Sequence, residues 1–303
     1  MKILVAGASG ALGRPLITRL HEAGHDVWGL ASRPESLDAM TARGAHAING
    51  NAMDRAGIFT ILEQLRPDVV IDQLTSLPAS PFDLANRLAA DRHLRLEGGG
   101  NLFAAAQACQ VTRYIQQSCG FYLDTNGPLA TEASRLRTHA PGNIGESARM
   151  YAALEKRVLG SHSMQGVCLR YGFFYGPGTW YWTEGAFNTH LHNREVSLLG
   201  AGSSVFSFIH VDDAAQATMA ALTAPAGVYN VVDNHPTPFH DWLAAYTRWV
   251  GAPAPARLSP QDALRLAGEE SVYYQNNLTG ANNHKARERL NLTPRPQPWL
   301  SAI

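Results

Sequence analysis

The chain opens with a short apolar run that ends at three glycines. Residues 2–6 are long enough for one buried parallel strand, and the run breaks into Gly7-Ala8-Ser9-Gly10-Ala11-Leu12-Gly13. A helical stripe of apolar side chains follows, at Leu12, Leu16, Ile17 and Leu20. A strand, a glycine turn and a helix in this order present unpaired backbone N–H groups to a phosphate. The stretch therefore predicts a dinucleotide-binding turn.

Apolar runs and helical patterns alternate as far as about residue 120. Further strands are predicted at residues 25–31, 44–51, 68–71 and 113–118, with helices at 58–65 and 84–110. Gly98-Gly99-Gly100 weakens the middle of the second of these helices. This alternation is typical of an α/β fold in which helices cover both faces of a parallel sheet.

The pattern continues beyond residue 140. It predicts a helix at 143–160, a strand at 167–170, and a long irregular stretch after Gly176-Pro177-Gly178. A β pattern returns at 206–211, and Asp212 and Asp213 are expected to cap a helix at 214–222. A strand at 229–232 and a helix at 240–250 follow.

Composition restricts the partners. Of the 303 residues, 45% are hydrophobic and 17% are charged, which is typical of a soluble globular protein. The 25 basic and 25 acidic residues cancel, so no net field attracts the chain to nucleic acid or to anionic membranes, and neither partner is expected.

The cysteines and the N-terminus indicate the compartment. Cys109, Cys119 and Cys168 lack metal-type spacing and are expected to be reduced thiols, and no metal is expected. The N-terminal apolar run is too short for a signal peptide, and no apolar run is long enough to span a bilayer. The expected location is cytoplasmic.

The end of the second predicted strand indicates which dinucleotide binds. Ser32 and Arg33 stand where a carboxylate would take the ribose hydroxyls of NAD, and the first acid is Glu35. A serine hydroxyl with a guanidinium suits the extra phosphate of NADP. NADP is therefore predicted over NAD; the alternative is a solvated arginine that opens a loop before Pro34.

Several segments together resemble a known family. In chain order they are Gly7-x-x-Gly10-x-x-Gly13, Asp68-Val-Val-Ile71, Ser118-Cys-Gly-Phe-Tyr122, Leu169-Arg-Tyr-Gly-Phe-Phe-Tyr-Gly-Pro-Gly178, Phe208-Ile-His-Val-Asp-Asp213 and Gly227-Val-Tyr-Asn230. They resemble the extended short-chain dehydrogenase/reductases, including the NAD(P)-dependent epimerase/dehydratase group. The resemblance implies a Rossmann-type core at residues 1–172, completed by 206–232, and a smaller substrate-binding lobe made of 173–205 and 233–303.

The resemblance also implies which positions contact the cofactor. They are Gly7, Ser9, Gly10, Ala11, Leu12, Gly13, Ser32, Arg33, Asn51, Ala52, Leu74, Thr75, Tyr151, Tyr171 and Phe173. For Tyr171, and for Tyr175 near it, packing in the core is the alternative role.

The chain departs from the family at the catalytic helix. Reductases of this family use a serine, matched by Ser118, and a Tyr-x-x-x-Lys pair whose ammonium favours the ionised phenol. Here Tyr151 has Glu155 four residues on, whereas Lys156 points about 140° away around the helix. If Glu155 instead matches the glutamate that follows the family's lysine, Tyr151 takes the lysine position and Ser147 the tyrosine position. This second register is preferred, and both registers lack the usual pair.

The sequence is compatible with three functions. The leading one is an NADP-dependent oxidoreductase of a small or medium organic substrate, with Ser118 and Ser147 facing the substrate and Tyr151 touching the nicotinamide ribose. An activated alkene or an iminium would need little help from an acid. The alternatives are an epimerase or dehydratase without net redox change, and a non-catalytic NADP-binding regulatory protein.

Aromatic and histidine side chains after the Gly-Pro-Gly turn are further candidates. Trp180, Tyr181, Trp182 and Phe187 suit either a pocket for a flat, ring-shaped substrate or the packing of the lobe. His190 and His192 are candidate proton donors or surface residues, and their spacing argues against a shared metal site. His210 is expected to be structural. Members of the family often pair through their helices, so a homodimer is compatible with the resemblance.

Overall fold

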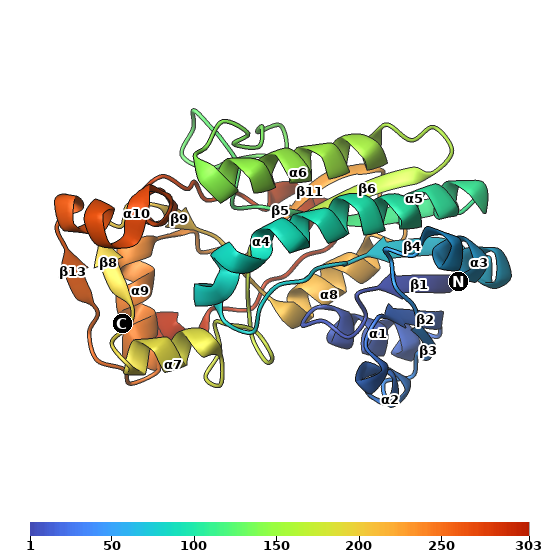
Figure 1. The fold of residues 1–303 in the computed structure, drawn as a ribbon, viewed down its shortest axis with the longest axis horizontal. Helices are drawn as coiled ribbons and strands as arrows, with labels where there is room; N and C mark the ends of the chain where they lie inside the picture. Colours follow the sequence, from blue (N-terminus) through green and yellow to red (C-terminus); the bar gives the residue numbers. More distant parts are fainter. Residues whose placement is uncertain (303) are drawn as a thin grey trace.

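The computed structural model describes residues 1–302, with a seven-stranded parallel sheet at its centre (Figure 1). Its strands are β1 (Lys2–Ala6), β2 (Asp26–Ala31), β3 (His46–Asn49), β4 (Val69–Asp72), β5 (Arg113–Cys119), β6 (Gln165–Tyr171) and β11 (Gly227–Val231). They lie in the order β3-β2-β1-β4-β5-β6-β11, and every adjacent pair is parallel. The expected doubly wound sheet is confirmed.

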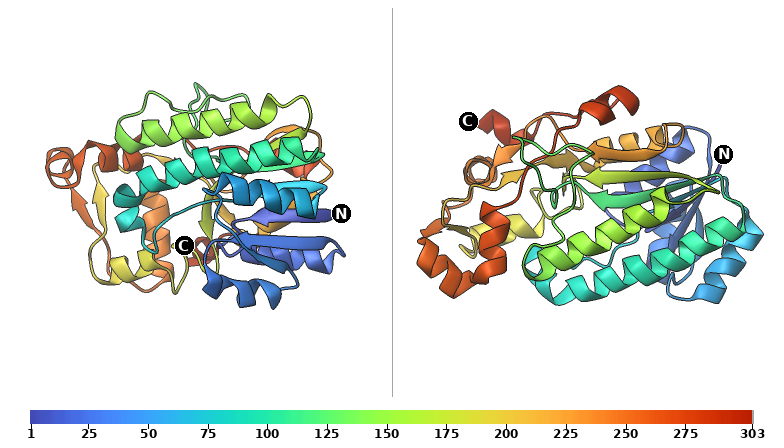
Figure 2. Two further views of the ribbon diagram at one scale, coloured as in Figure 1. Left: turned by 45° about the vertical axis from the view of Figure 1, so that its right-hand side comes forward. Right: turned by 90° about the horizontal axis from the view of Figure 1, so that it is seen from above.

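Helices cover both faces of this sheet (Figure 2). They are α1 (Gly13–Glu22), α2 (Leu37–Thr41), α3 (Arg55–Leu65), α4 (Leu84–His93), α5 (Gly99–Ala108), α6 (Gly142–Leu159) and α8 (Val211–Ala220). Helix α1 packs against α8 on one face, and α3 packs against α5 on the other, where α6 lies on β5 and β6. Strand β1 shows why both faces must be covered. Its alternate residues Ile3 and Leu4 point to opposite faces, and both are 0% exposed.

Smaller elements beyond the carboxyl ends of the strands build a second apolar core. Helix α11 (His284–Arg289) is not one of them, because it packs against β11 and its Ala286 belongs to the core of the sheet. The elements of the second core are β7 (Phe173–Tyr175), α7 (Ala186–His192), β8 (Ser197–Leu199), β9 (Val205–Phe206), β10 (Phe208–His210), β12 (Thr237–Pro238), α9 (Phe239–Trp249), β13 (Ala256–Leu258), α10 (Pro260–Asn276) and η4 (Pro298–Ala302). The core is largely aromatic, and Trp242 contacts Tyr181, Phe187 and Phe208 with ring centroids 5.1 to 5.5 Å apart. These rings pack the lobe, which is one of the two roles expected for the aromatic segment.

Short helical turns connect the remaining parts of the chain. They are η1 (Pro34–Ser36), η2 (Pro81–Asp83) and η3 (Leu94–Gly98), the last of which is a π-helical turn that joins α4 to α5. The expected helix at 84–110 therefore continues past Gly98 through a widened turn. Within residues 1–302, no helix has the length and apolar character that crossing a membrane requires.

The start of α8 corrects one prediction. Asp212 and Asp213 do not cap this helix, because the helix begins at Val211 and His210 is its cap, with Nδ1 accepting a hydrogen bond from the backbone N–H of Asp212 at 3.1 Å. Asp213 instead accepts hydrogen bonds from the Arg295 backbone and side chain. The expected strand at 206–211 is likewise two strands, β9 and β10, which pair with β12 and β7.

Candidate functional site

The glycine turn is closely packed between β1 and α1. Gly7 has a φ of +79°, and a Cβ there would lie 2.3 Å from the Gln73 carbonyl oxygen. A Cβ on Gly13 would lie 2.4 Å from the carbonyl oxygen of Gly7, whereas a Cβ on Gly10 would meet the same oxygen at 3.2 Å. Glycine at these positions lets the first turn of α1 start close against the strand, which is the geometry that a pyrophosphate needs. The residues present fit a dinucleotide.

Other positions expected to contact the cofactor follow the carboxyl ends of neighbouring strands. Ser32 and Arg33 come directly after β2 and are exposed, and Asn51 and Ala52 follow β3. Because β1, β2, β3 and β4 are parallel neighbours, these ends lie at one edge of the sheet. The fold therefore gathers these predicted contacts at the edge where the glycine turn lies.

The loop after β4 is fixed by a buried carboxylate. Asp91 of α4 is 3% exposed, and its Oδ1 accepts hydrogen bonds from Thr75 Oγ1 at 3.0 Å and from the Ser76 backbone N–H at 2.6 Å. Leu74 donates its N–H to Asp72 at 3.1 Å. Burial raises the pKa of Asp72 above its usual range, against the nearby Arg157 and Arg95.

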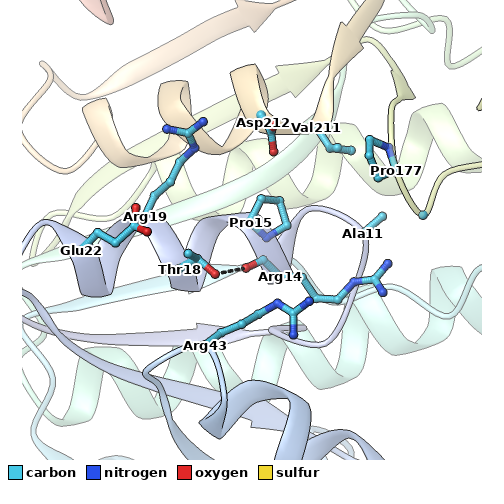
Figure 3. Close-up of a pocket in the computed structure, with 11 residues that line it drawn as sticks. Ala11, Arg14, Pro15, Thr18, Arg19, Glu22, Arg43, Pro177, Val211 and Asp212 are labelled. Carbon is cyan, nitrogen blue, oxygen red and sulfur yellow. Dashed lines mark hydrogen bonds between the residues drawn. The ribbon is translucent and has the colours of Figure 1, made fainter.

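A cavity of about 450 Å³ adjoins the glycine turn on the outer side of α1 (Figure 3). Its lining is Ala11, Arg14, Pro15, Thr18, Arg19, Glu22, Arg43, Pro177, Gly178, Val211 and Asp212. Arg14 follows the last glycine of the turn directly, and a Cβ on Gly178 would lie 2.3 Å from an Arg14 Nη atom. Sequence reasoning missed Arg14 and Arg43, although the position of Arg14 next to Gly13 was a signal for a positive charge near a phosphate.

Ser118 is part of a buried polar cluster under α6. Its hydroxyl donates to Glu155 Oε1 at 2.6 Å, and the same oxygen accepts from Arg170 Nε at 2.7 Å. Arg170 Nη2 donates to Glu155 Oε2 at 2.8 Å, which completes a bidentate ion pair. Glu155 thus lies level with the ends of β5 and β6, whereas Tyr151 and Ser147 lie one and two turns nearer the N-terminus of α6.

Ser147 and Tyr151 each lie against an arginine of the facing helix layer. Arg92 Nη1 lies 3.5 Å from Ser147 Oγ and donates to Asn143 Oδ1 at 3.0 Å, and Arg92 also pairs with Glu146. The guanidinium carbon of Arg95 lies 5.4 Å from the centre of the Tyr151 ring. Burial raises the pKa of Tyr151 above its usual range, and Arg95 opposes that rise, so the phenol is protonated at neutral pH. Sequence reasoning singled out neither arginine.

The remaining aromatic candidates are packed in the two cores. Tyr171 is 1% exposed, and its hydroxyl lies 2.6 Å from Thr218 Oγ1 and accepts from Gln73 Nε2 at 3.4 Å. Its side chain therefore occupies the core position that was the alternative to nicotinamide contact. Phe173 stacks on Phe206 with ring centroids 4.4 Å apart.

His190 connects α7 to the loop after β4. Its Nε2 lies 3.0 Å from Ser80 Oγ, its Nδ1 contacts Glu195, and its ring lies 4.0 Å from that of Phe82. His192 is exposed and is not part of this group. In the part of the chain that the structure describes, no three His, Cys, Asp or Glu side chains are placed to hold a metal ion.

Comparison with known proteins agrees with this geometry. The model of the "NAD dependent epimerase/dehydratase family" matches residues 3–232. A "3-diazoavenalumate denitrifying reductase" from Streptomyces sp is 35% identical over 100% of this chain and 99% of the relative, and a "2-alkyl-3-oxoalkanoate reductase" from Stenotrophomonas maltophilia is 25% identical over 84% and 77%. The structure of UDP-glucose 4-epimerase from Thermotoga maritima superposes with a TM-score of 0.76 at 20% identity, over 100% of this chain and 96% of that one. The chain belongs to the NAD dependent epimerase/dehydratase family and is an NAD(P)-dependent enzyme of the short-chain dehydrogenase/reductase type.

Proposed function

We propose that the chain is an NADPH-dependent reductase of a small electrophilic compound whose reduction needs no general acid, with an aryl diazonium or related diazo compound as the first candidate. The observation that carries this proposal is the side-chain set on α6. Ser147 and Tyr151 stand in the positions of the family's tyrosine and lysine when Glu155, which pairs with Arg170, is matched to the family's glutamate.

NADPH supplies a hydride when bound. Reduction of a ketone by hydride also needs a proton, because an alkoxide forms, and the Tyr-x-x-x-Lys pair delivers that proton in the family. Hydride transfer to the carbon that bears a diazonium group needs no proton. The hydride forms a new C–H bond, the C–N bond breaks with its electron pair leaving on dinitrogen, and the products are the arene, N2 and NADP⁺. A site that lacks the usual proton relay suits this chemistry.

The nature of the relative supports the same chemistry. The Streptomyces protein that is 35% identical over the whole chain is named as a denitrifying reductase of a diazo compound. Protonated Tyr151 and Ser147 are then hydrogen-bond donors that orient the cofactor and the substrate, and Ser118 holds Glu155 beneath them.

The preference for NADPH rests on the end of β2. Ser32 and Arg33 are exposed there, and the nearest acid, Glu35, lies beyond Pro34 in η1. A guanidinium and a hydroxyl at this position favour the 2′-phosphate over a free ribose. Arg14 and Arg43 add positive charge along the outer side of α1.

A panel of acceptors tests the proposal. The purified protein is incubated with NADPH deuterated at the transferred position and with an arenediazonium salt, an enone, an iminium or a ketone. We expect NADPH consumption with the diazonium salt and deuterium on the carbon that lost nitrogen, at a rate above that without protein. The matched control is the Gly10→Ala variant, in which a folded protein binds the cofactor less well.

Each other outcome contradicts the proposal in a distinct way. Isomerisation or dehydration of a substrate without net NADPH consumption identifies an epimerase or dehydratase. Binding of NADPH without turnover of any acceptor class identifies a regulatory protein. Reduction of the ketone alone shows that another acid replaces the missing pair.

A further inference from the structure

Arg95 is a buried cation beside the residue that replaces the family's lysine. It lies in the π-helical turn η3 between α4 and α5 and is 3% exposed. Its guanidinium carbon lies 5.4 Å from the centre of the Tyr151 ring, so it faces α6 at the level of the lysine position. π-Helical turns are rare in proteins, and those that are found frequently lie at functional sites.

One nitrogen of the Arg95 guanidinium is buried without a hydrogen-bond partner in the described part of the chain. Nε of Arg95 donates to Asp91 Oδ2 at 2.7 Å, but Nη1 is buried and has no hydrogen-bond partner among residues 1–302. A buried N–H group without an acceptor is costly, and native proteins seldom keep one without a reason. Because Nη1 is closed off from solvent, Arg95 acts on the buried groups around it, of which Tyr151 is one.

Asp91 links Arg95 to the loop that is expected to contact the cofactor. One carboxylate oxygen of Asp91 pairs with Arg95, and the other accepts hydrogen bonds from Thr75 Oγ1 and the Ser76 N–H. The chain of contacts therefore runs from Thr75 through Asp91 and Arg95 to Tyr151.

The electrostatic effects agree with this geometry. Arg95 lowers the pKa of Tyr151 against the dominant effect of burial, and the Asp91 carboxylate in turn opposes the effect of burial on the pKa of Arg95 and favours its charged form. In other family members the lysine has this lowering effect on the pKa of the tyrosine one turn earlier on the helix, at the position that Ser147 occupies here.

We propose that Arg95 supplies from the α4 side the positive charge that other family members carry on a lysine of α6, and that this charge holds the Tyr151 ring in the orientation in which its hydroxyl contacts the nicotinamide ribose. Arg95 is then a positioning residue that holds the Tyr151 ring and the ribose together. This inference rests on the same alignment of Tyr151 with the lysine position as the proposed function, but it does not depend on which substrate is reduced.

The test measures NADPH binding without substrate, by nicotinamide fluorescence. We expect Arg95→Gln to weaken binding about tenfold, because the Tyr151 ring loses the buried cation that positions it. The control is Arg87→Gln, since Arg87 is an exposed arginine of α4, the helix that leads into η3. That variant should bind NADPH within about twofold of the native chain.

A second variant moves the charge between the helices. The double variant Arg95→Gln/Tyr151→Lys returns a cation to α6 and should regain most of the lost affinity. Tyr151→Lys alone should not improve binding, because it places two cations together in a buried site. Thermal unfolding of each variant identifies any loss of folding, and Arg95→Gln/Asp91→Asn replaces the single variant if the unpaired Asp91 prevents folding.

Two results would overturn the inference. One is a folded Arg95→Gln protein that binds NADPH within about twofold of the native chain. The other is a folded double variant with lysine at position 151 that regains no affinity. Because no substrate is present, neither result depends on whether a diazo compound is reduced.

Discussion

Ser118 donates its hydroxyl hydrogen bond to Glu155, with 2.6 Å between Ser118 Oγ and Glu155 Oε1. Both residues are buried, at 2% and 7% exposure, and Arg170 neutralises the carboxylate. A hydroxyl hydrogen that is committed to a carboxylate is not also donated to a substrate. The contact therefore gives Ser118 a role in holding α6 on β5.

Replacement of Ser118 separates this role from a catalytic one. We expect Ser118→Ala to lower the free energy of unfolding by about 1–3 kcal/mol, because Glu155 loses a buried donor. The folded fraction should keep most of its turnover number, whereas Ser147→Ala should lower turnover with little change in stability. Chemical denaturation and steady-state kinetics measure the two quantities. Abolished turnover in Ser118→Ala at unchanged stability would assign Ser118 the direct catalytic role that the family resemblance implies.

The glycines of the turn should respond differently to alanine. A Cβ at position 13 meets backbone atoms of Gly7 and Ala8 at 2.4 to 2.6 Å, so Gly13→Ala should lower the free energy of unfolding by about 1–3 kcal/mol even without cofactor. A Cβ at position 10 meets only the Gly7 oxygen, at 3.2 Å, so Gly10→Ala should keep its stability and lose NADPH affinity. Thermal unfolding without ligand and cofactor titration separate the two effects. Equal loss of stability in both variants would contradict this assignment.

Arg33 should set the choice between the two nicotinamide dinucleotides. Arg33→Asp removes a donor for the 2′-phosphate and supplies an acceptor for ribose hydroxyls, so the ratio of NADPH to NADH affinity should fall about tenfold or more. Arg287→Asp is the control, because Arg287 is an exposed arginine of α11. An unchanged ratio in Arg33→Asp would show that Arg33 is a solvated loop residue.

Asp233 should give the stability an unusual dependence on pH. Burial raises the pKa of Asp233 to about 6, although Gln297 and the His235 N–H donate to it. The folded state therefore holds this proton more tightly than the unfolded state. Its contribution favours folding below about pH 4 and is lost as the pH rises through about 6, by about 3 kcal/mol in total.

Asp233→Asn isolates this contribution. The free energy of unfolding, measured by denaturant titration from pH 4 to pH 8, should fall less steeply across the lower half of that range in Asp233→Asn than in the native chain. Parallel curves for the two proteins would show that Asp233 titrates normally.

The positions of the main strands along the chain and the glycine turn were predictable because they depend on local sequence. Apolar runs such as residues 2–6 are buried on both sides, and period and spacing suffice to recognise them. The cap of α8 was not predictable from local sequence. Asp212 and Asp213 are residue types that often cap helices, but Asp213 instead binds Arg295, which lies more than eighty residues later in the chain. Arg95 was missed for a similar reason. Its contact with Tyr151 depends on how α4 faces α6, which no local pattern records.

The π-helical turn at Leu94–Gly98 makes the number of residues in this segment matter as much as their identity. Each residue of an α-helix turns the chain by about 100°, and a π turn accommodates one residue more than an α turn. Deletion of a single residue such as Glu97 would close the turn and rotate α4 against α5 by about that angle. Arg92 and Arg95 would then lose their contacts with Ser147 and Tyr151, while α5 would keep its packing against α3. The rotation of α4 relative to α5 therefore depends on the number of residues in η3, and so does the placement of both arginines at the site.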